Sequence, residues 1–317
     1  MSTLSLACQL MCASEAAYAI DPTAPSGQYN PLYLPGTTTI DPNKVVYQKQ
    51  YDALGLIGDP YIVTDLQIEA CLVGKTNTGI IVAFRGTLPP ALTWDSFFDW
   101  LQDFFAVPTS NINLPGEVHS GYLFAVISLI DGVKNAINAL DPSGSLNLFM
   151  TGHSKGGGMA PIAAQYMKGA FGIQTTQTIT FAGPNPGNAD FCKVYNQENP
   201  NDIRYANYLD IVPLLPPAPN TISDIEAIPN LPGFILDLLN DAKTWNYDTV
   251  GGLWYIDSSK TASYISPDYE PILLAVRLGE IGSTIGSGDI SAIANAHHAD
   301  CGFGYMQGAC NGDVCTT

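Results

Sequence analysis

Residues 148–158 read LFMTGHSKGGG, and this stretch decides the fold. Gly152, Ser154 and Gly156 form a Gly-x-Ser-x-Gly pattern between a short apolar strand and a helical segment. In that context the pattern is typical of a sharp turn that lifts the serine hydroxyl out of the sheet, toward the positive end of the next helix. A glycine-rich turn with a capping serine is the alternative. The stretch predicts Ser154 as a nucleophile.

The flanking sequence alternates between strand-like and helix-like patterns. Apolar and β-branched runs predict strands, and apolar residues at three- and four-residue spacing predict helices. The predicted strands are 44–51, 61–73, 78–84, 146–150, 178–182 and 203–207, and the predicted helices are 95–105, 121–140 and 159–168. This alternation indicates an α/β architecture with a largely parallel sheet, and a single domain over 1–317 is the simplest organisation.

The composition restricts the class of protein. The chain has 317 residues, of which 46% are hydrophobic and 13% charged, which is typical of a folded globular protein. Twelve Lys and Arg against 29 Asp and Glu give a net charge of -17. That balance argues against nucleic acid and anionic lipid surfaces as partners, and leaves apolar contact with neutral lipid open.

The cysteines and the N-terminus give further expectations. Seven cysteines without a C-x-x-C pair do not support a zinc site, and no other metal or cofactor is indicated. Three cysteines in the last 17 residues fit either a disulfide or reduced, buried thiols. Met1–Ile20 contains Glu15 and no basic residue, so we expect an amphipathic helix rather than a signal peptide. No charge-free apolar run long enough to span a membrane is found, and the compartment stays open.

A nucleophilic serine needs a base, and the chain has four histidines. His153 lies next to the serine on the turn, where its side chain is expected to point into the sheet. His119 precedes a predicted helix and suits a packing or capping role. The base is therefore expected to be His297 or His298, in a polar stretch near the C-terminus.

The acid that orients the base is expected between the serine and the histidine along the chain. Asp210 directly follows the predicted strand 203–207, so its carboxylate would emerge at the edge of the sheet beside the elbow. Asp190, Asp202 and Asp224 are competitors, but they lie in polar stretches where a solvated or capping carboxylate is ordinary.

Four stretches in the same order resemble the class 3 lipases, the fungal triacylglycerol lipase-like branch of the α/β-hydrolases. They are Ala83–Thr87, Val118–Tyr122, the elbow itself and Asn207–Pro213, supported by Asp99–Asp103. The resemblance implies an α/β-hydrolase fold with a central, mostly parallel (mixed) sheet, flanking helices and a lid. It also implies Ser154 as nucleophile, Asp210 as acid and a histidine in the C-terminal loop, with His297 favoured because family members often show Ala-His before a small polar residue.

The oxyanion formed during acyl transfer needs two preorganised donors. The backbone N–H of Lys155 follows the nucleophile and heads a helix, so it is one candidate. The resemblance implies Thr87 as an oxyanion-hole residue, and Gly86–Thr87 at the end of a strand could supply both an N–H and a hydroxyl. Lys155 replaces the apolar residue usual in the family. Arg85 is expected to form a buried pair with Asp99 or Asp103.

Together these residues predict a serine carboxylester hydrolase that works through an acyl-enzyme on Ser154. A triacylglycerol lipase is favoured, with a lipid or other ester substrate, at an oil-water interface if a lid is present. Phospholipase A1, feruloyl esterase and short-chain esterase are the enzymatic alternatives. A non-catalytic lipid-binding protein is the alternative from another class.

Two apolar segments are predicted to act as a lid, near 88–110 and 214–260. The first carries Phe97 and Phe98 on an aromatic helical face, and the second carries Phe234 within a predicted helix over 225–239. Each segment alone could equally pack in the core. Because two such segments accompany one site, we expect them to cover it and to contribute Phe97, Phe98 and Phe234 to substrate binding.

Overall fold

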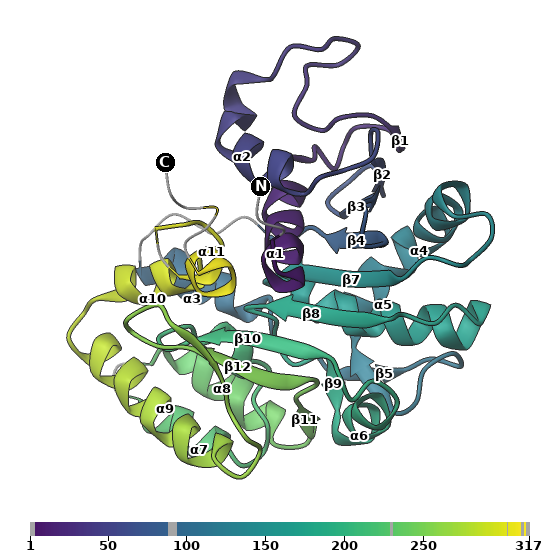
Figure 1. Cartoon of the computed structure of the whole chain (residues 1–317). Coiled ribbons are helices and arrows are strands. Elements are labelled where there is room, and N and C mark those ends of the chain that lie inside the picture. Colours follow the sequence, from purple (N-terminus) through teal and green to yellow (C-terminus); the bar gives the residue numbers. More distant parts are fainter. Residues whose placement is uncertain (1–3, 88–93, 229–230, 303, 312–313, 315–317) are drawn as a thin grey trace.

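The computed structural model describes residues 4–87, 94–228, 231–302, 304–311 and 314. Nine strands of this described part form the main sheet (Figure 1). In spatial order they are β1 (Gly27–Gln28), β2 (Tyr61–Thr64), β3 (Ala70–Lys75), β4 (Ile80–Phe84), β7 (Leu148–His153), β8 (Gln177–Phe181), β10 (Ile203–Asn207), β12 (Gly252–Ile256) and β13 (Ala262–Tyr264). The central strands from β4 to β12 pair in parallel, and the pairs on either side of them are antiparallel.

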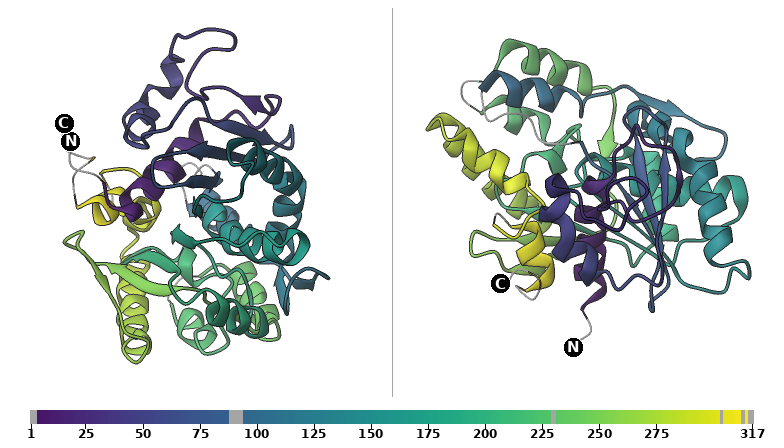
Figure 2. Two further views of the ribbon diagram at one scale, coloured as in Figure 1. Left: turned by 45° about the vertical axis from the view of Figure 1, so that its right-hand side comes forward. Right: turned by 90° about the horizontal axis from the view of Figure 1, so that it is seen from above.

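Helices cover both faces of this sheet. The helices α4 (Ser120–Leu140) and α5 (Lys155–Phe171) pack on one face, and α1 (Leu6–Ala16) packs on the other (Figure 2). The residues of β4 alternate accordingly: Val82 and Phe84 join the first cluster, while Ile81 and Ala83 join the second. Strands buried on both faces are apolar throughout, which explains their continuous hydrophobic runs. The predicted mixed α/β sheet with flanking helices is confirmed.

Two strand predictions need correction. Residues 44–51 are helical, as η2 (Pro42–Tyr47) followed by α2 (Gln48–Ala53). Asp41 accepts a hydrogen bond from the Asn43 N–H, and the proline beside it suits a helix start. The run 61–73 is two strands, because Asp65 Oδ1 accepts three successive backbone N–H groups at 2.9 Å and closes a turn between β2 and β3.

The described part of the chain also contains a second, small antiparallel sheet and further helices. The sheet comprises β11 (Tyr247–Asp248), β9 (Gly187–Asn188), β6 (Glu117–His119) and β5 (Pro108–Ser110). The helices are η1 (Ala17–Ala19), α3 (Trp94–Gln102), α6 (Ala189–Glu198), η3 (Val212–Leu214), α7 (Ile222–Glu226), α8 (Gly233–Ala242), α9 (Glu270–Gly286), α10 (Ile290–His297) and α11 (Tyr305–Cys310). The single helix predicted over 225–239 is wrong: α7 ends at Glu226, and Pro232 precedes α8, since proline cannot continue a helix.

A disulfide between Cys8 and Cys310 joins α1 to α11, which pack against each other. Cys301 is also disulfide-bonded, whereas Cys12, Cys71 and Cys192 are buried free thiols. Cys301 and Cys310 therefore follow the disulfide alternative. Cys12 lies close enough to Cys8 and Cys310 for shared metal ligation, but the disulfide occupies two of the three sulfur atoms.

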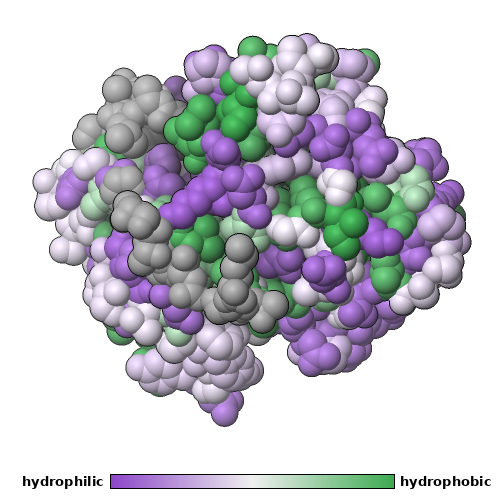
Figure 3. Space-filling model, turned by 45° about the horizontal axis from the view of Figure 1, so that its top comes forward, coloured by the Kyte–Doolittle hydropathy of each residue, from purple (hydrophilic) through white to green (hydrophobic). Residues whose placement is uncertain are grey.

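Among the described helices, α4 alone has the length and hydropathy of a membrane span. Its buried residues belong to the main hydrophobic cluster, so its composition suits packing against α5 and the sheet. Figure 3 shows exposed hydrophobic residues in separate patches bordered by hydrophilic ones. Several large apolar side chains that remain exposed lie between positions 45 and 68: Val45, Val46, Ile57, Leu66 and Ile68.

Candidate active site

The turn between β7 and α5 has the geometry that the glycine pattern predicts. Ser154 adopts φ 59° and ψ -131°, a region that non-glycine residues rarely occupy. A Cβ atom on Gly152 would lie 2.2 Å from the carbonyl carbon of Gly156, and a Cβ on Gly156 would lie 2.2 Å from the Phe84 oxygen. Only glycines permit the backbone segments to approach so closely. The close approach holds Ser154 between the ends of β4 and β8, where its N–H donates to the Phe181 carbonyl at 3.0 Å.

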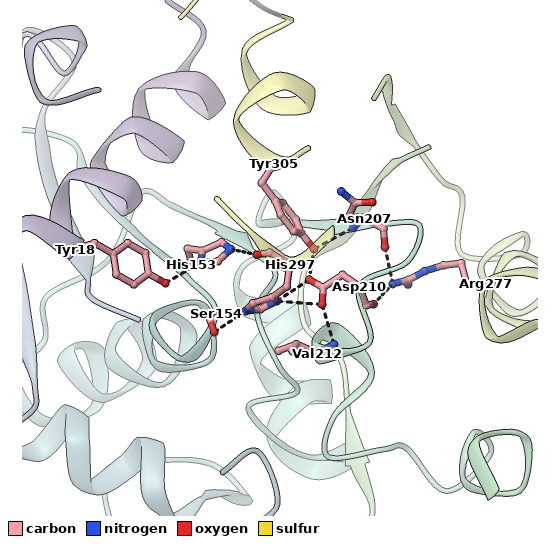
Figure 4. A network of polar contacts seen from close by, with 9 residues as sticks. All are labelled: Tyr18, His153, Ser154, Asn207, Asp210, Val212, Arg277, His297 and Tyr305. Atoms are coloured by element: carbon pink, nitrogen blue, oxygen red, sulfur yellow. Dashed lines mark hydrogen bonds and ion pairs between the residues drawn. The ribbon is translucent and has the colours of Figure 1, made fainter. Parts of the chain in front are cut away.

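Three side chains from distant parts of the chain meet at this turn (Figure 4). His297 Nδ1 lies 2.9 Å from Asp210 Oδ2, and His297 Nε2 lies 2.9 Å from Ser154 Oγ. A carboxylate can only accept, so Nδ1 carries the proton and Nε2 accepts the hydrogen bond from the serine hydroxyl. The side chains are buried, and the arrangement of nucleophile, base and orienting acid is that of a Ser-His-Asp triad.

The competing residues have other partners or positions. His298 follows α10, and burial lowers the pKa of its imidazole. Asp202 accepts hydrogen bonds from the Thr178 N–H at 2.8 Å and from the Tyr195 hydroxyl at 2.6 Å, which tie β8 to α6. Asp190 and Asp224 lie in the first turns of α6 and α7. His297, in contrast, lies at hydrogen-bond distance from both Ser154 Oγ and the Asp210 carboxylate.

Several donors support the Asp210 turn. The Tyr305 hydroxyl donates to Asp210 Oδ2 at 2.7 Å, and the Val212 N–H donates to Oδ1 at 3.0 Å. The buried Arg277 guanidinium donates to the carbonyls of Asn207 and Asp210 at 3.1 and 3.0 Å. Sequence reasoning missed Tyr305 and Arg277, because neither belongs to a motif and both reach the turn only through the tertiary fold.

The two remaining histidines form hydrogen bonds with backbone groups. His153 Nε2 lies 2.7 Å from the carbonyl oxygen of His297, so it donates, and Nδ1 accepts from the Tyr18 hydroxyl at 2.8 Å. Burial, and then the neighbouring His297, holds the pKa of His153 well below its usual range, which keeps this ring neutral. His119 caps α4 by accepting the Tyr122 N–H, and burial lowers the pKa of His119 to about 3.

The helix α3 packs against His297. The Trp100 ring packs edge-on against His297 with centroids 4.9 Å apart, and against Phe104 at the same separation. Ser154 is fully buried. The predicted lid residue Phe98 is buried in the main hydrophobic cluster, whereas Phe234 on α8 is 38% exposed. The Phe97 side chain and residues 88–93 lie outside the described part of the chain.

The two predicted oxyanion residues border one cavity. Thr87 and Lys155 line a cavity of about 540 Å³, and Thr87 also lines a cavity of about 200 Å³ next to His297. A Cβ on Gly86 would lie 2.6 Å from the His153 carbonyl, so the loop after β4 runs directly along the elbow. Among the described ion pairs none joins Arg85 to Asp99 or Asp103, so the expected buried pair of Arg85 was wrong. At this cavity it is Lys155 that forms an ion pair, with Glu69.

Part of the chain is similar in sequence to known lipases. The family model for Lipase (class 3) matches residues 81–220. Secreted mono- and diacylglycerol lipase 1 of Fusarium solani is 29% identical over 141 residues, which cover 44% of this chain and 39% of that protein. The chloroplastic phospholipase A(1) DAD1 of Arabidopsis thaliana is 30% identical over 156 residues, covering 43% of this chain and 33% of that protein. The matches thus span less than half the length of these relatives.

The fold also has close counterparts. The solved structure of an MDLA variant from Penicillium cyclopium superposes with a TM-score of 0.55 at 21% sequence identity. The superposition covers 82% of this chain and 85% of that one. At this identity the likeness concerns the fold, which is that of the fungal lipases.

Proposed function

Because the chain belongs to the class 3 lipase family, we propose that it is a serine carboxylester hydrolase acting on lipid esters, with a triacylglycerol lipase favoured. The observation that carries the proposal is the hydrogen-bond chain from Ser154 through His297 to Asp210 on a strained turn. A structural serine would not require positive φ or a base at hydrogen-bond distance.

In the proposed reaction the Ser154 oxygen attacks the ester carbonyl carbon while its proton passes to His297 Nε2. The Asp210 carboxylate stabilises the imidazolium without taking the proton. Collapse of the tetrahedral intermediate breaks the bond to the alcohol, and His297 returns the proton to that leaving oxygen. Water then attacks the acyl-enzyme by the same route and releases the carboxylic acid and free Ser154.

The oxyanion of both intermediates is assigned to the Lys155 N–H and to Thr87. The Lys155 N–H begins α5, where the first N–H groups of a helix have no partner within it. Thr87 borders the same cavity as Lys155, one residue beyond the glycine that packs on the elbow. One such donor contributes roughly 3 to 4 kcal/mol to the stability of the transition state.

The preference for a lipid ester rests on the covered site. Ser154 is fully buried and Trp100 on α3 packs on the base, so we propose that this helix moves to admit substrate. An apolar helix that moves exposes apolar surface, which an oil-water interface would stabilise. Phospholipase A1, feruloyl esterase and short-chain esterase remain enzymatic alternatives, and the names of the relatives include both diacylglycerol lipases and a phospholipase A(1).

The test is a substrate panel run on the wild-type chain and on Ser154→Ala. Emulsified triacylglycerol, a phospholipid, a feruloyl ester and nitrophenyl esters of increasing chain length separate the enzymatic alternatives. We expect the highest turnover with long-chain emulsified ester. A lipid-binding protein without catalysis would instead bind these lipids equally well in both forms and release no acid from any of them.

A further inference from the structure

The larger cavity beside the nucleophile is lined by charged as well as apolar side chains. Its volume is about 540 Å³, and it is bordered by Thr87, by aromatic rings of the core and by charged side chains from four segments of the chain. Lys155 and Arg85 are two of only twelve basic residues in the chain, and both line it. A groove for a plain hydrocarbon chain would not need two cations next to the reacting carbon, because burying charge costs free energy.

Lys155 reaches this cavity from the position directly after Ser154. Its ammonium forms an ion pair with Glu69, which lies on the turn between β2 and β3. The Lys155 side chain is 22% exposed and that of Glu69 is 8% exposed. An ammonium group has three N–H donors, and Glu69 is the one hydrogen-bond partner for them among the described residues. Lys155 can therefore hold Glu69 and donate to a ligand at the same time.

Arg85 and Tyr122 also line the cavity, and each has a buried donor atom without a partner in the described part of the chain. Arg85 Nε and the Tyr122 hydroxyl are buried, and neither has a hydrogen-bond partner among the described residues. Tyr122 is 2% exposed, so water reaches its hydroxyl poorly. Unpaired buried polar atoms are rare in folded proteins and call for a partner. A guanidinium can only donate, so the partner that suits this lining is rich in acceptors.

The acids of the cavity are compatible with such a ligand. Glu69 is already neutralised by Lys155. Asp103 is an exposed residue at the rim, where burial of its carboxyl raises the pKa and the Lys155 charge lowers it. The two acids of the lining are thus a buried Glu69 that is paired with Lys155 and an exposed Asp103, whose charge solvent screens more strongly than that of the buried groups.

We infer that Lys155, Arg85 and Tyr122 form a subsite for an anionic group, a carboxylate or a phosphate, carried by the ester substrate near its scissile bond. The inference rests on the proposed esterase function and narrows its substrate class. The anion could lie on the acyl side, as a dicarboxylic monoester, or on the alcohol side, as a phospholipid head group. Both sources present the same acceptors to Lys155.

The test compares substrates that differ only in this charge. On the acyl side, nitrophenyl hexanoate is paired with the nitrophenyl monoester of adipic acid, in which a carboxylate replaces the terminal methyl group. On the alcohol side, dihexanoylglycerol is paired with dihexanoyl phosphatidic acid. The readout is the ratio of kcat/KM for the anionic substrate to kcat/KM for the neutral one, and the pair that responds to the variants identifies the source.

Lys155→Met keeps the backbone N–H and the length of the side chain but removes the charge, so the ratio should fall about tenfold. Glu69→Gln removes the competing carboxylate, so the ratio should rise several-fold. Lys168→Met is the matched control, since Lys168 lies on the same helix and pairs with Glu198 away from the cavity. A ratio that neither Lys155→Met nor Glu69→Gln changes, for both substrate pairs, would overturn the inference.

A binding measurement separates failure of the inference from failure of the proposed function. Hexyl phosphate, titrated into the wild-type chain by calorimetry, reports on the subsite without turnover. Binding that Lys155→Met weakens supports the subsite even if no ester is hydrolysed. Turnover of neutral esters without any binding of hexyl phosphate and without a response of the ratio supports the esterase and rejects the subsite.

Discussion

At the scale of single residues, His297 and His298 are neighbours in the chain but differ in what they can do at Ser154. His297 bonds both Ser154 and Asp210, so His297→Ala should lower kcat/KM by several orders of magnitude, as Ser154→Ala does. The double variant should be no worse, because triad residues act as a unit. His298→Ala is expected to keep most of the activity in the same assay. An inactive His298→Ala beside an active His297→Ala would move the base by one residue.

Glu15 gives a prediction about pH. Burial, and then the charge of Asp300, raises the pKa of Glu15 to about 7 from a model-peptide value of 4.5. Between these values the folded chain binds more protons at this site than the unfolded chain, so rising pH costs stability. Glu15→Gln should therefore raise Tm at pH 8 by about 2 °C or more, and change it much less at pH 4. A difference in Tm that stays constant from pH 4 to pH 8 would contradict the assigned pKa.

The sequence predicted the residues of the site that lie in local patterns and missed those that do not. Ser154 stands in a glycine motif, and Asp210 directly follows a strand, so local spacing was enough to propose them. Tyr305, Arg277 and Trp100 contribute through contacts between elements that are far apart in the chain. No local pattern reports such contacts. Spacing also left His297 and His298 open, since it does not indicate which ring faces the serine.

At the scale of elements, α3 lies against the histidine of the proposed triad, and we expect it to control access to Ser154. It contacts α10 through Trp100 and His297 and also packs against α8. If α3 moves as a lid, the rate should rise steeply once the concentration of ester passes its solubility limit. Phe98→Ser and Phe234→Ser should both weaken this rise. The buried Phe98 ring anchors α3 in the closed position, and the Phe234 ring on α8 is an exposed apolar group that can contact the interface. Simple saturation through the limit, with both variants silent, would leave an esterase without a lid.

The predictions of strands and helices succeeded where the spacing of apolar residues matched the faces that are buried. The parallel strands are buried on both faces, so their apolar runs are continuous, and α4 keeps one apolar face over its length. The strand prediction for residues 44–51 failed because their β-branched residues and tyrosines lie on a largely exposed helical segment, where a cap at Asp41 decides the conformation. The helix over 225–239 failed because the apolar spacing continued past a proline.

At the scale of the whole molecule, the Cys8–Cys310 disulfide joins two ends of the chain 302 residues apart. Closing so long a loop restricts the unfolded chain strongly, and such bonds typically contribute about 2 to 4 kcal/mol. The double variant Cys8→Ser, Cys310→Ser should lower Tm by several degrees in thermal unfolding. A dithiol reductant should lower Tm of the wild type more than that of the double variant. Equal Tm values without reductant would show that packing of α1 against α11 is sufficient.

The fold class could be predicted from composition and pattern, but the disulfide and the antiparallel edges of the sheet could not. The apolar fraction and the alternation of segments indicated an α/β protein with a large core. The pairing of Cys8 with Cys310 depends on where α1 and α11 lie in the finished fold, and cysteine spacing cannot report that. The antiparallel strands β2, β3 and β13 likewise extend the sheet through tertiary pairing.

The central claim is that Ser154 is the nucleophile of an acyl-transfer enzyme, and covalent trapping tests it most directly. A fluorophosphonate should form one phosphorus-oxygen bond to Ser154 Oγ, with loss of fluoride and transfer of the serine proton to His297. Intact-mass spectrometry should then give one adduct per chain, located by peptide mapping at Ser154 and absent from Ser154→Ala. An adduct at another residue, or a Ser154→Ala chain that keeps a tenth of the ester turnover, would contradict the account.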